Sequence, residues 1–212
     1  MIRILHEGDP GRKESEAFIR DVFRRSYGAN IETFMPHLIE VRDRQGEISA
    51  VVGYRDAEHH PLFLEVYLDE PVEQALSNYL GHQVERASIV EVGNLAEAKP
   101  GDARMAIIAA TAYLREAGYD WVVFTGVIKL RNAFRKLGLV PKELQEADIH
   151  RLPQQERERW GTYYGDRPVV CFGDIRNGYD SLQELWAMLR DTWAEAVEAG
   201  QRQRLLRQRG AS

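Results

Sequence analysis

The sequence predicts an α/β (α+β) fold in which helices flank one mixed β-sheet and a long C-terminal helix follows. The clearest observation is a strand–helix–strand–helix order over residues 87–137, where apolar runs alternate with amphipathic segments over short joints. A β-hairpin pattern over residues 38–54 is the second observation. The third is that 44% of the 212 residues are hydrophobic, which suffices for a full core. We predict a single domain over residues 1–177 and a C-terminal helix with a basic tail over residues 178–212.

The N-terminal part of the chain predicts one helix and one hairpin. Residues 13–27 carry apolar side chains at helical spacing, and Gly28 ends the pattern. Leu38–Val41 and Ile48–Tyr54 are apolar runs on either side of a polar turn that contains glycine. This pattern is typical of two antiparallel strands.

A third apolar run, Leu62–Leu68, predicts another extended segment. Glu65 interrupts this run, and by alternation it faces either a cleft or the solvent. Asp69 resembles a helix N-cap, and Pro71 suits the first turn of a helix that ends near Leu80.

The middle of the chain is the most regular part. Ala87–Val92 predicts a strand, Asn94–Gly101 a loop, and Asp102–Ala117 a helix with one apolar face. Trp121–Thr125 is almost wholly apolar, as expected for a strand buried on both faces, and Leu130–Leu137 predicts a short helix. We expect the two strands to be adjacent and parallel, joined by a right-handed crossover.

The last part of the chain has a weaker pattern. Gln154–Trp160 predicts a helical turn and Val169–Phe172 a short strand. From Ser181 to about Gln208, apolar side chains at helical spacing predict a long helix with cations at its C-terminal end, where they suit the helix dipole. These cations are Arg202, Arg204, Arg207 and Arg209.

Composition and charge exclude several classes of protein. Lys and Arg number 28 against 33 Asp and Glu, and this net charge of −5 disfavours a nucleic-acid partner. Cys171 is the single cysteine, so no intrachain disulfide and no cysteine-based zinc site can form. His59 and His60 have no further ligands at metal spacing, so we predict no metal site. We see no signal peptide and no long apolar run, so we expect a cytoplasmic protein without a transmembrane segment.

The start of the helix predicted at Asp102 is a candidate phosphate site. Its first turn has free backbone N–H groups and the positive end of the helix dipole, which can hold a phosphate or pyrophosphate. The short side chains of Gly101 and Ala103 would let a ligand approach, and Arg104 and Met105 follow them. A plain strand-to-helix connection capped by Asp102 is the alternative.

The segment after the second of these strands adds to this hypothesis. It reads Asn-Ala-Phe-Arg-Lys-Leu-Gly-Leu from Asn132 to Leu139. This resembles, in compressed form, the N-x-x-A-x-x-L-Y-x-K-L-G-F signature of the GCN5-related N-acetyltransferase (GNAT) superfamily, and the resemblance covers roughly Ser88 to Leu139. It implies that the two central strands splay apart, that the pantetheine arm of an acyl carrier lies in the gap, and that Asn132 and Thr125 adjoin it. Helix N-capping is the alternative role for Asn132.

The sequence departs from the GNAT pattern at two places, and in both it resembles the acyl-homoserine-lactone synthases. Residues 101–106 lack the middle glycine of the pyrophosphate loop, and Phe134 stands where many members carry a tyrosine that protonates the leaving thiolate. The synthases share the fold and take acyl chains from acyl carrier protein. Their Glu-Ile/Val-Ser-Arg-Leu/Phe strand end resembles residues 91–95, Glu-Val-Gly-Asn-Leu, with Asn94 in place of the arginine. The resemblance implies acyl-CoA or an acyl-phosphopantetheine as co-substrate.

The whole chain resembles the thermostable hemolysin family more closely still. The resemblance extends from the first helix to about Ile175. The family name implies lysis of red cells, although the residues show no long amphipathic hairpin and no export signal. The stretches that carry it are Phe34–Leu38, Leu62–Leu68, Ile89–Ala96, Trp121–Thr125, Leu130–Phe134 and Trp160–Tyr164.

Four side chains are candidate catalytic residues. Glu91 ends an apolar strand, where desolvation raises a carboxyl pKa and suits a general base for an amine nucleophile; a solvent-facing strand end is the alternative. Asn94 orients a substrate carbonyl or caps the loop, and a backbone N–H near Gly93 or Asn94 would polarise the thioester. His37, at the start of the hairpin, is a base, a substrate contact or an ordinary turn histidine. Glu65 is the remaining candidate carboxylate.

Taken together, the residues and the resemblances predict an acyltransferase that moves an acyl group from acyl-CoA or acyl carrier protein to a small amine. Two other hypotheses stay open: a membrane-lytic protein, as the family name implies, and a non-catalytic module that binds an acyl carrier. An open apolar gap between the strands at Val92 and Phe124 would favour the transferase or the module, and an exposed apolar patch would favour lysis. Trp160, Tyr163 and Tyr164 either cover an acyl tunnel or pack on the late strand.

Overall fold

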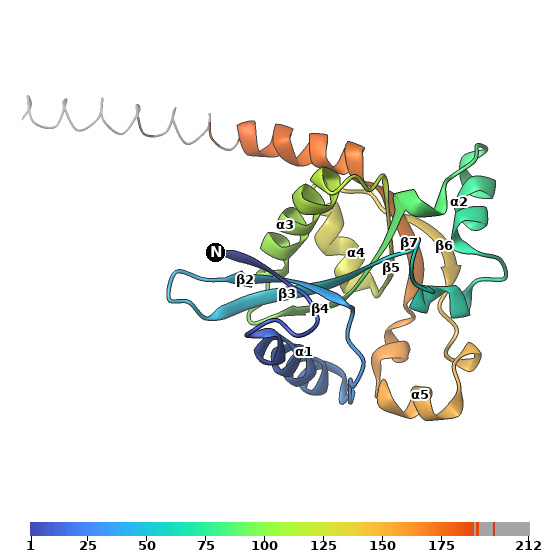
Figure 1. Cartoon of the computed structure of the whole chain (residues 1–212), viewed down its shortest axis with the longest axis horizontal. Coiled ribbons are helices and arrows are strands. Elements are labelled where there is room, and N and C mark those ends of the chain that lie inside the picture. The colour runs from blue at the N-terminus through green and yellow to red at the C-terminus, as the bar shows by residue number, and fades with distance from the viewer. Residues whose placement is uncertain (189, 191–196, 198–212) are drawn as a thin grey trace, which may run out of the picture.

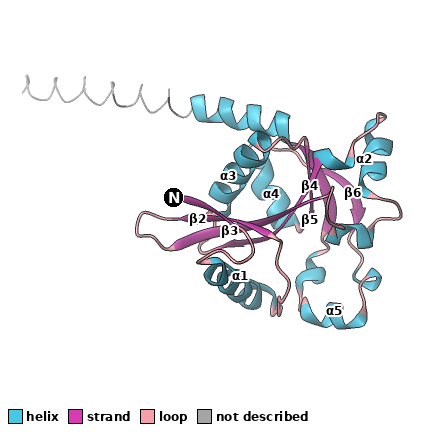
Figure 2. Ribbon diagram, in the orientation of Figure 1, coloured by secondary structure: helices cyan, strands magenta, loops and turns pink. Residues whose placement is uncertain are grey.

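Helices cover both faces of one mixed sheet in the computed structural model, which describes residues 1–188, 190 and 197 (Figures 1 and 2). Within these residues, seven strands pair in the order β1-β2-β3-β4-β5-β7-β6, and this architecture confirms the predicted fold class. The strands are β1 (Ile2–Leu5), β2 (His37–Arg42), β3 (Ile48–Asp56), β4 (Ile89–Glu97), β5 (Trp121–Gly126), β6 (Lys142–Glu146) and β7 (Val169–Asp174). The α-helices are α1 (Arg12–Tyr27), α2 (Val72–Leu80), α3 (Ala103–Glu116), α4 (Ile128–Arg135) and α5 (Gln154–Arg159). Short 3-10 helices are η1 (Phe63–Tyr67), η2 (Arg86–Ser88), η3 (Ile149–Arg151) and η4 (Tyr163–Asp166).

Strand pairing is antiparallel except at the centre of the sheet. There β4 and β5 run parallel, with Ile89 opposite Trp121 and Glu91 opposite Val123. On its other side β5 pairs antiparallel with β7. The prediction that the strands before and after the helix at residues 102–117 are adjacent and parallel is therefore confirmed.

Each face of the sheet has its own apolar core. Figure 1 shows α1 on one face and α3 with α4 on the other. Under α1, Ile19 packs with Leu38 of β2, and both side chains are fully buried. Under α3, Ala106 and Leu114 pack with Ile39, the next residue of β2. Neighbouring residues of a strand thus enter opposite cores, because side chains alternate along the strand.

The segment after β3 differs from the sequence prediction. Leu62–Leu68 is not a strand, because η1 forms there and its first backbone N–H groups donate to the Glu91 carboxylate. Asp69 is not the N-cap of the next helix either, since α2 begins at Val72. The Glu65 carboxylate accepts the Val72 N–H at 3.1 Å, and so it satisfies one of the free donors at this helix start.

Two element boundaries also differ from the prediction, and one strand was not predicted. The sequence predicts a loop from Asn94. In the structure β4 continues to Glu97, which pairs with Ala50 of β3, because the second half of β4 stays paired with β3. β6 is polar and lies at the edge of the sheet, so it has no apolar pattern to detect. The C-terminal helix begins at residue 175 instead of Ser181. Its predicted extension to Gln208 and the basic tail lie outside the described residues, and the domain boundary at 177 stays a prediction.

A β-bulge in β4 opens the centre of the sheet. The register of β4 against β3 shifts between Gly93 and Ala96, so that Asn94 and Leu95 together stand opposite Val52. Asn94 has a φ of +51°, in the left-handed region that asparagine tolerates better than most residues. The pairing of β4 with β5 ends before the bulge, and the two strands separate beyond it.

Met35 covers the α1 side of this bulge. Its backbone N–H donates to Asn94 Oδ1 at 2.8 Å, and its side chain lies over Gly53 and Gly93, which pair across β3 and β4. A Cβ atom at Gly53 would lie 2.6 Å from Met35 Cβ, and one at Gly93 would lie 2.7 Å from Met35 Cε. Glycine at both positions therefore lets Met35 approach the two strands.

We predict that Gly53→Ala destabilises the fold more than Gly93→Ala. The first change forces the new methyl group against Met35 Cβ, which the backbone holds in place, at a cost of about 1–3 kcal/mol. The second meets only the flexible end of the same side chain. Urea unfolding of the two variants measures both costs, and equal losses would contradict this account of Met35.

Candidate functional site

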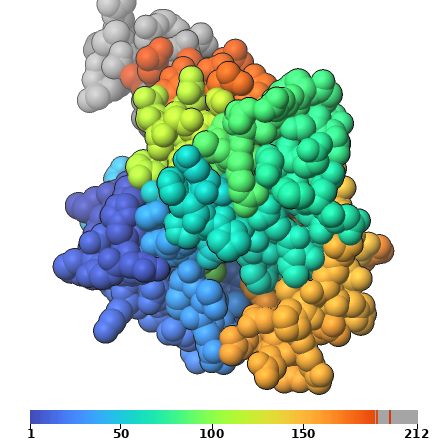
Figure 3. All heavy atoms as spheres, turned by 45° about the vertical axis from the view of Figure 1, so that its right-hand side comes forward, coloured from blue at the N-terminus to red at the C-terminus, as the bar shows by residue number. Residues whose placement is uncertain are grey.

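A cavity of about 1160 Å³ lies where β4 and β5 separate. Val92 and Phe124, on the separating strands, both line it, and residues from both faces of the sheet complete the lining. The volume exceeds the about 300–1,000 Å³ of ordinary ligand pockets, so it can hold a long arm together with a second molecule. Figure 3 shows the teal segment after β3 lying across one face of the molecule beside the orange segment that includes α5.

The start of α3 brings some of the predicted donor residues to this cavity. Gly101, Ala103 and Arg104 line it, whereas Asp102 and Met105 do not. Met105 is 56% exposed on the solvent side of α3. Of the five residues predicted for this loop, the structure therefore brings three together at the cavity.

The backbone N–H groups at this helix start already have an anionic partner. Glu97 Oε2 accepts the N–H of Gly101 at 2.9 Å and that of Ala103 at 3.1 Å. Lys129 Nζ lies 3.5 Å from Glu97 Oε1. A phosphate that binds here must displace this carboxylate or lie beside it, toward the exposed side chain of Arg104.

The α4 side of the cavity carries Asn132 and a pair of phenyl rings. Asn132 lies within α4, so it is not an N-cap, and its Oδ1 accepts from Arg135 at 3.2 Å. Phe134 stacks on Phe124 of β5 with ring centroids 4.9 Å apart. Asn132, Phe134 and Phe124 line the cavity, so this wall presents a polar amide beside two apolar rings.

Aromatic rings line the opposite face of the cavity. Trp160 lies 5.2 Å from Tyr163 and 6.0 Å from Tyr164 between ring centroids, and these three residues line the cavity. The hydroxyl groups of Tyr67 and Tyr164 hydrogen-bond to each other. Burial raises the pKa of Tyr164 to about 12, so its hydroxyl is neutral at physiological pH. The ring side chains on this face are Phe23, Tyr27, Phe63, Tyr67, Trp160, Tyr163 and Tyr164.

Thr125 presents an unpaired hydroxyl to this face. Its Oγ1 is buried, and no described residue hydrogen-bonds with it, although its carbonyl accepts from the Tyr163 hydroxyl at 3.3 Å. Strand alternation puts Thr125 on the same side of β5 as Val123, which stands opposite Glu91. The hydroxyl therefore lies on the Glu91 side of the cavity.

Glu91 is a buried carboxyl group in the cavity wall, only 3% exposed. Its Oε2 accepts the Phe63 N–H at 2.9 Å, and its Oε1 accepts the Leu64 N–H at 3.0 Å. Burial raises the pKa of Glu91 to about 7, against the opposing effects of the two N–H donors and the positive charge of Arg55. Each oxygen keeps a lone pair for another donor. The group can therefore take up and release a proton near neutral pH.

Gly93 and Asn94 line the cavity at the bulge. The Met35 side chain covers Gly93, and the Met35 N–H engages the Asn94 side-chain oxygen. This hydrogen bond ties the bulge to the segment before β2, and the two roles that the sequence analysis offers for Asn94 stay predictions.

Glu65 and His37 do not line the cavity. Burial alone would raise the pKa of Glu65, but Arg86 and the N–H groups of Val72 and Leu62 together outweigh it and lower that pKa. His37 Nδ1 lies 2.9 Å from His6 Nδ1, and its ring packs 4.8 Å from that of Tyr54. Burial and the neighbouring His6 lower the pKa of His37. Both side chains thus already have protein partners away from the cavity.

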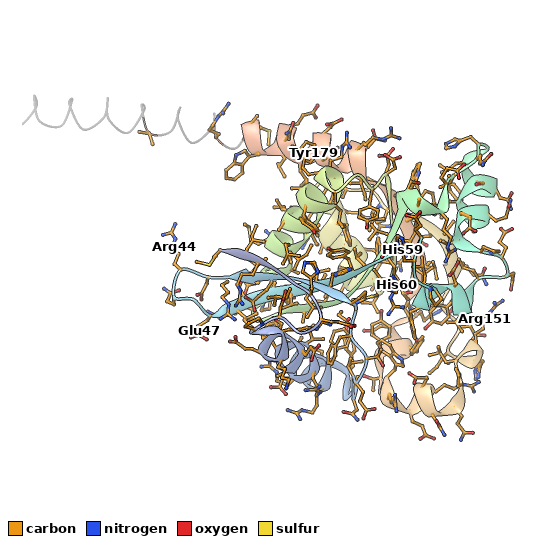
Figure 4. The ribbon with its side chains drawn as sticks, viewed as in Figure 1. Arg44, Glu47, His59, His60, Arg151 and Tyr179 are labelled. Carbon is orange, nitrogen blue, oxygen red and sulfur yellow. The ribbon has the colours of Figure 1, made fainter. Side chains whose placement is uncertain are left out.

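The described part of the chain shows no group of three or more His, Cys, Asp and Glu side chains that could hold a metal ion. His59 and His60 instead hydrogen-bond to Asp56, and Figure 4 shows their position. Among the same residues, we find no helix with the length and hydrophobicity needed to cross a bilayer.

The sequence prediction omitted Arg55 and most of the aromatic wall. Arg55 lines the cavity directly opposite Glu91 in the β3–β4 ladder. The sequence did carry a signal for Arg55, because it is a cation directly after the apolar run 48–54. Phe63 and Tyr67 were hidden by the incorrect strand prediction, because a 3-10 helix gives them a different orientation.

Comparison with solved structures supports the same architecture. TofI, in a ternary complex with an inhibitor and MTA, is 15% identical with a TM-score of 0.59, over 86% of this chain and 96% of that one. FeeM, an N-acyl amino acid synthase from uncultured soil microbes, is 14% identical with a TM-score of 0.57, over 85% and 98%. BjaI, a CoA-dependent acyl-homoserine lactone synthase with SAM and isopentyl-CoA, is 12% identical with a TM-score of 0.54, over 87% and 88%.

These likenesses show the GNAT-like fold of the acyl-homoserine lactone synthases, as the sequence predicts. No curated protein matches the chain. The family profile described as thermostable hemolysin matches residues 5–179, which include every cavity residue named above. The chain therefore belongs to the thermostable hemolysin family.

Proposed function

We propose that this protein is an acyltransferase that moves an acyl group from a pantetheine thioester to a small amine. The observation that carries the proposal is the cavity between the separated strands β4 and β5, with the buried carboxyl of Glu91 in its wall. The structural neighbours that act on acyl groups support it, including an N-acyl amino acid synthase and CoA-dependent acyl-homoserine lactone synthases.

The donor lies on the α3–α4 face in this proposal. Arg104 attracts its phosphate, and Asn132 contacts the pantetheine arm that passes along Phe124 into the gap. Both acyl-CoA and an acyl carrier protein present such an arm. Glu97, which occupies the N–H groups at the start of α3, disfavours a pyrophosphate there by charge repulsion.

The reaction requires one bond to form and one to break. The amine nitrogen attacks the thioester carbonyl carbon, polarised by a backbone N–H near Gly93 or Asn94, and the C–S bond breaks. Glu91 takes the proton that the nitrogen loses. The departing sulfur leaves as a thiolate and takes a proton from solvent, because Phe134 has none to donate. The products are an N-acyl amide and a free thiol.

A non-catalytic module that binds an acyl carrier would share the cavity but not the use of Glu91. A lytic activity, which the family name implies, requires neither. Measurements of acyl transfer and donor binding on the same preparation separate these functions.

Glu91→Gln should lower acyl transfer by about 10²- to 10⁴-fold while donor binding survives. Gln keeps the size of the side chain but cannot accept the proton. Glu65→Gln is the matched control, because Glu65 also accepts backbone N–H groups beside η1 yet lies outside the cavity lining. Transfer is followed by mass spectrometry, and an equal loss in both variants would mean that Glu91 only anchors η1.

The pH dependence of transfer should report Glu91 directly. Because burial raises its pKa to about 7, kcat/KM should rise with pH through that value as the base form appears. Glu91→Gln should remove this limb of the profile from its residual activity. A profile that is flat between pH 6 and 8 in the parent protein, measured with an amine of known pKa, contradicts the assignment.

The free energy of unfolding should fall as pH rises toward 7, whereas kcat/KM should rise. A carboxyl whose pKa is raised on folding stabilises the protein fully below its ordinary value of 4.5, and this contribution is lost as pH rises through about 7. The free energy of unfolding should therefore fall by up to about 3 kcal/mol more in the parent than in Glu91→Gln. Urea titrations at pH 5 and pH 8 measure the difference.

Arg104→Glu should weaken binding of a phosphopantetheine thioester by about tenfold at low ionic strength, because it places like charge beside the phosphate. Arg44→Glu makes the same charge change at the exposed turn between β2 and β3, where Figure 4 shows it away from the cavity-lining helices. Titration calorimetry with acyl-CoA compares them. Equal affinities in the two variants would make the start of α3 a plain crossover.

A further inference from the structure

Arg55 and Glu91 form a cross-strand pair at the cavity. They stand directly opposite each other in the β3–β4 ladder, and both line the cavity. Opposite residues of an antiparallel pair project from the same face of a sheet, with Cβ atoms about 5 Å apart. A guanidinium and a carboxyl group therefore adjoin the same part of the cavity, on the side that carries the aromatic wall.

The guanidinium of Arg55 has spare donors. Its Nη1 donates to the Pro61 carbonyl at 3.0 Å, while its Nε is buried and unpaired among the described residues. Within that part of the chain, Arg55 forms no ion pair. Glu91 affects it only through the longer-range attraction noted above, since the Glu91 oxygens accept backbone N–H groups.

The other carboxylates nearby are already engaged. Asp56, the next residue, accepts from the backbone N–H and the ring of His59. Glu65 is held by Arg86 at 2.7 Å. Proteins usually give a buried N–H group an acceptor, and a partly buried cation an anion. The Nε–H group of Arg55 has no such partner among the described residues, and an anionic ligand would supply one.

The guanidinium geometry selects the kind of anion. Its planar fork matches a carboxylate or a phosphate through two parallel hydrogen bonds. The proposed phosphate-binding residue Arg104 lies on the α3 face of the sheet, whereas Arg55 lies on the face of η1 and Glu91. A carboxylate carried by the second substrate therefore fits Arg55 better than the donor's phosphate.

Resting on the proposed acyl transfer, we propose that Arg55 binds the carboxylate of the acceptor and that the acceptor is an α-amino acid. Such a molecule carries an ammonium and a carboxylate on one carbon atom, so it can face Glu91 and Arg55 at once with complementary charge. The ammonium gives one proton to Glu91, which releases it to solvent before attack, and Glu91 then takes the second proton that the nitrogen loses as the amide forms. The carboxylate stays on Arg55 throughout, so the product is an N-acyl amino acid.

The test measures how the protein distinguishes a carboxylate from its uncharged analogue. The probes are the individual L-amino acids and their carboxamides, titrated by calorimetry into the full chain with and without CoA. We expect at least one amino acid to bind about 10- to 100-fold more tightly than its carboxamide, the range typical of a charge-assisted contact. Arg55→Gln should reduce this ratio to below about threefold, and Arg55→Lys should give an intermediate value.

Arg151→Gln is the matched control. Arg151 donates to the Leu68 carbonyl, so it anchors the same segment as Arg55 does, but it does not line the cavity. Figure 4 shows it at the outer edge of the molecule. This variant should keep the parent ratio, which separates carboxylate recognition from support of the segment after β3.

The outcomes distinguish this inference from the proposed function. Transfer to amines without any preference for a carboxylate would overturn the role of Arg55 and leave the acyltransferase intact. Carboxylate-selective binding that depends on Arg55, without transfer to any amino acid, would keep the binding site and remove the reaction. If amino acids and carboxamides bind equally, and Arg55→Gln instead weakens binding of a dicarboxylic acyl-CoA, the carboxylate belongs to the acyl group and the acceptor assignment is wrong.

Discussion

The bulge at Asn94 and Leu95 is the constraint on which the rest of this structure depends. It places two residues of β4 opposite Val52 and shifts the register, directly after the point where the pairing of β4 with β5 ends. Separated strands cannot close the sheet, so a cavity remains at the centre of the domain. The Asn94 side chain, bonded to the Met35 N–H, holds the left-handed backbone that makes the bulge.

The opening joins two chemically different faces. On the α3–α4 side, the exposed Arg104 and the amide of Asn132 give the cavity a polar wall, which we propose for a phosphate-bearing arm. On the η1 side, aromatic rings surround the Arg55–Glu91 pair. In the proposed reaction, a thioester that enters from the first face would meet the amine on the second, so that the sheet separates the two substrates.

Glu91 links this chemistry to the fold. Its two oxygens hold the first N–H groups of η1, and the same burial that positions them raises its pKa to about 7. Glu97 also stabilises the fold while lining the cavity: at the start of α3 its carboxylate accepts the N–H groups of Gly101 and Ala103. In both places a carboxylate stabilises a turn and also adjusts what a ligand meets.

Sequence periodicity by itself determined the elements whose apolar faces repeat regularly: α1, the β2–β3 hairpin, α3 and the parallel β4–β5 pair. The resemblance to the GNAT superfamily and the acyl-homoserine-lactone synthases, and not the periodicity, predicted that Glu91, Asn94 and Asn132 lie near one opening between these strands. Only the tertiary structure decided that Leu62–Leu68 forms a 3-10 helix, since its N–H groups bond to Glu91, which lies more than twenty positions later in the chain. It alone set Arg55 opposite Glu91 and moved Glu65 and His37 away from the cavity, because strand register and long-range hydrogen bonds are not encoded in any local spacing.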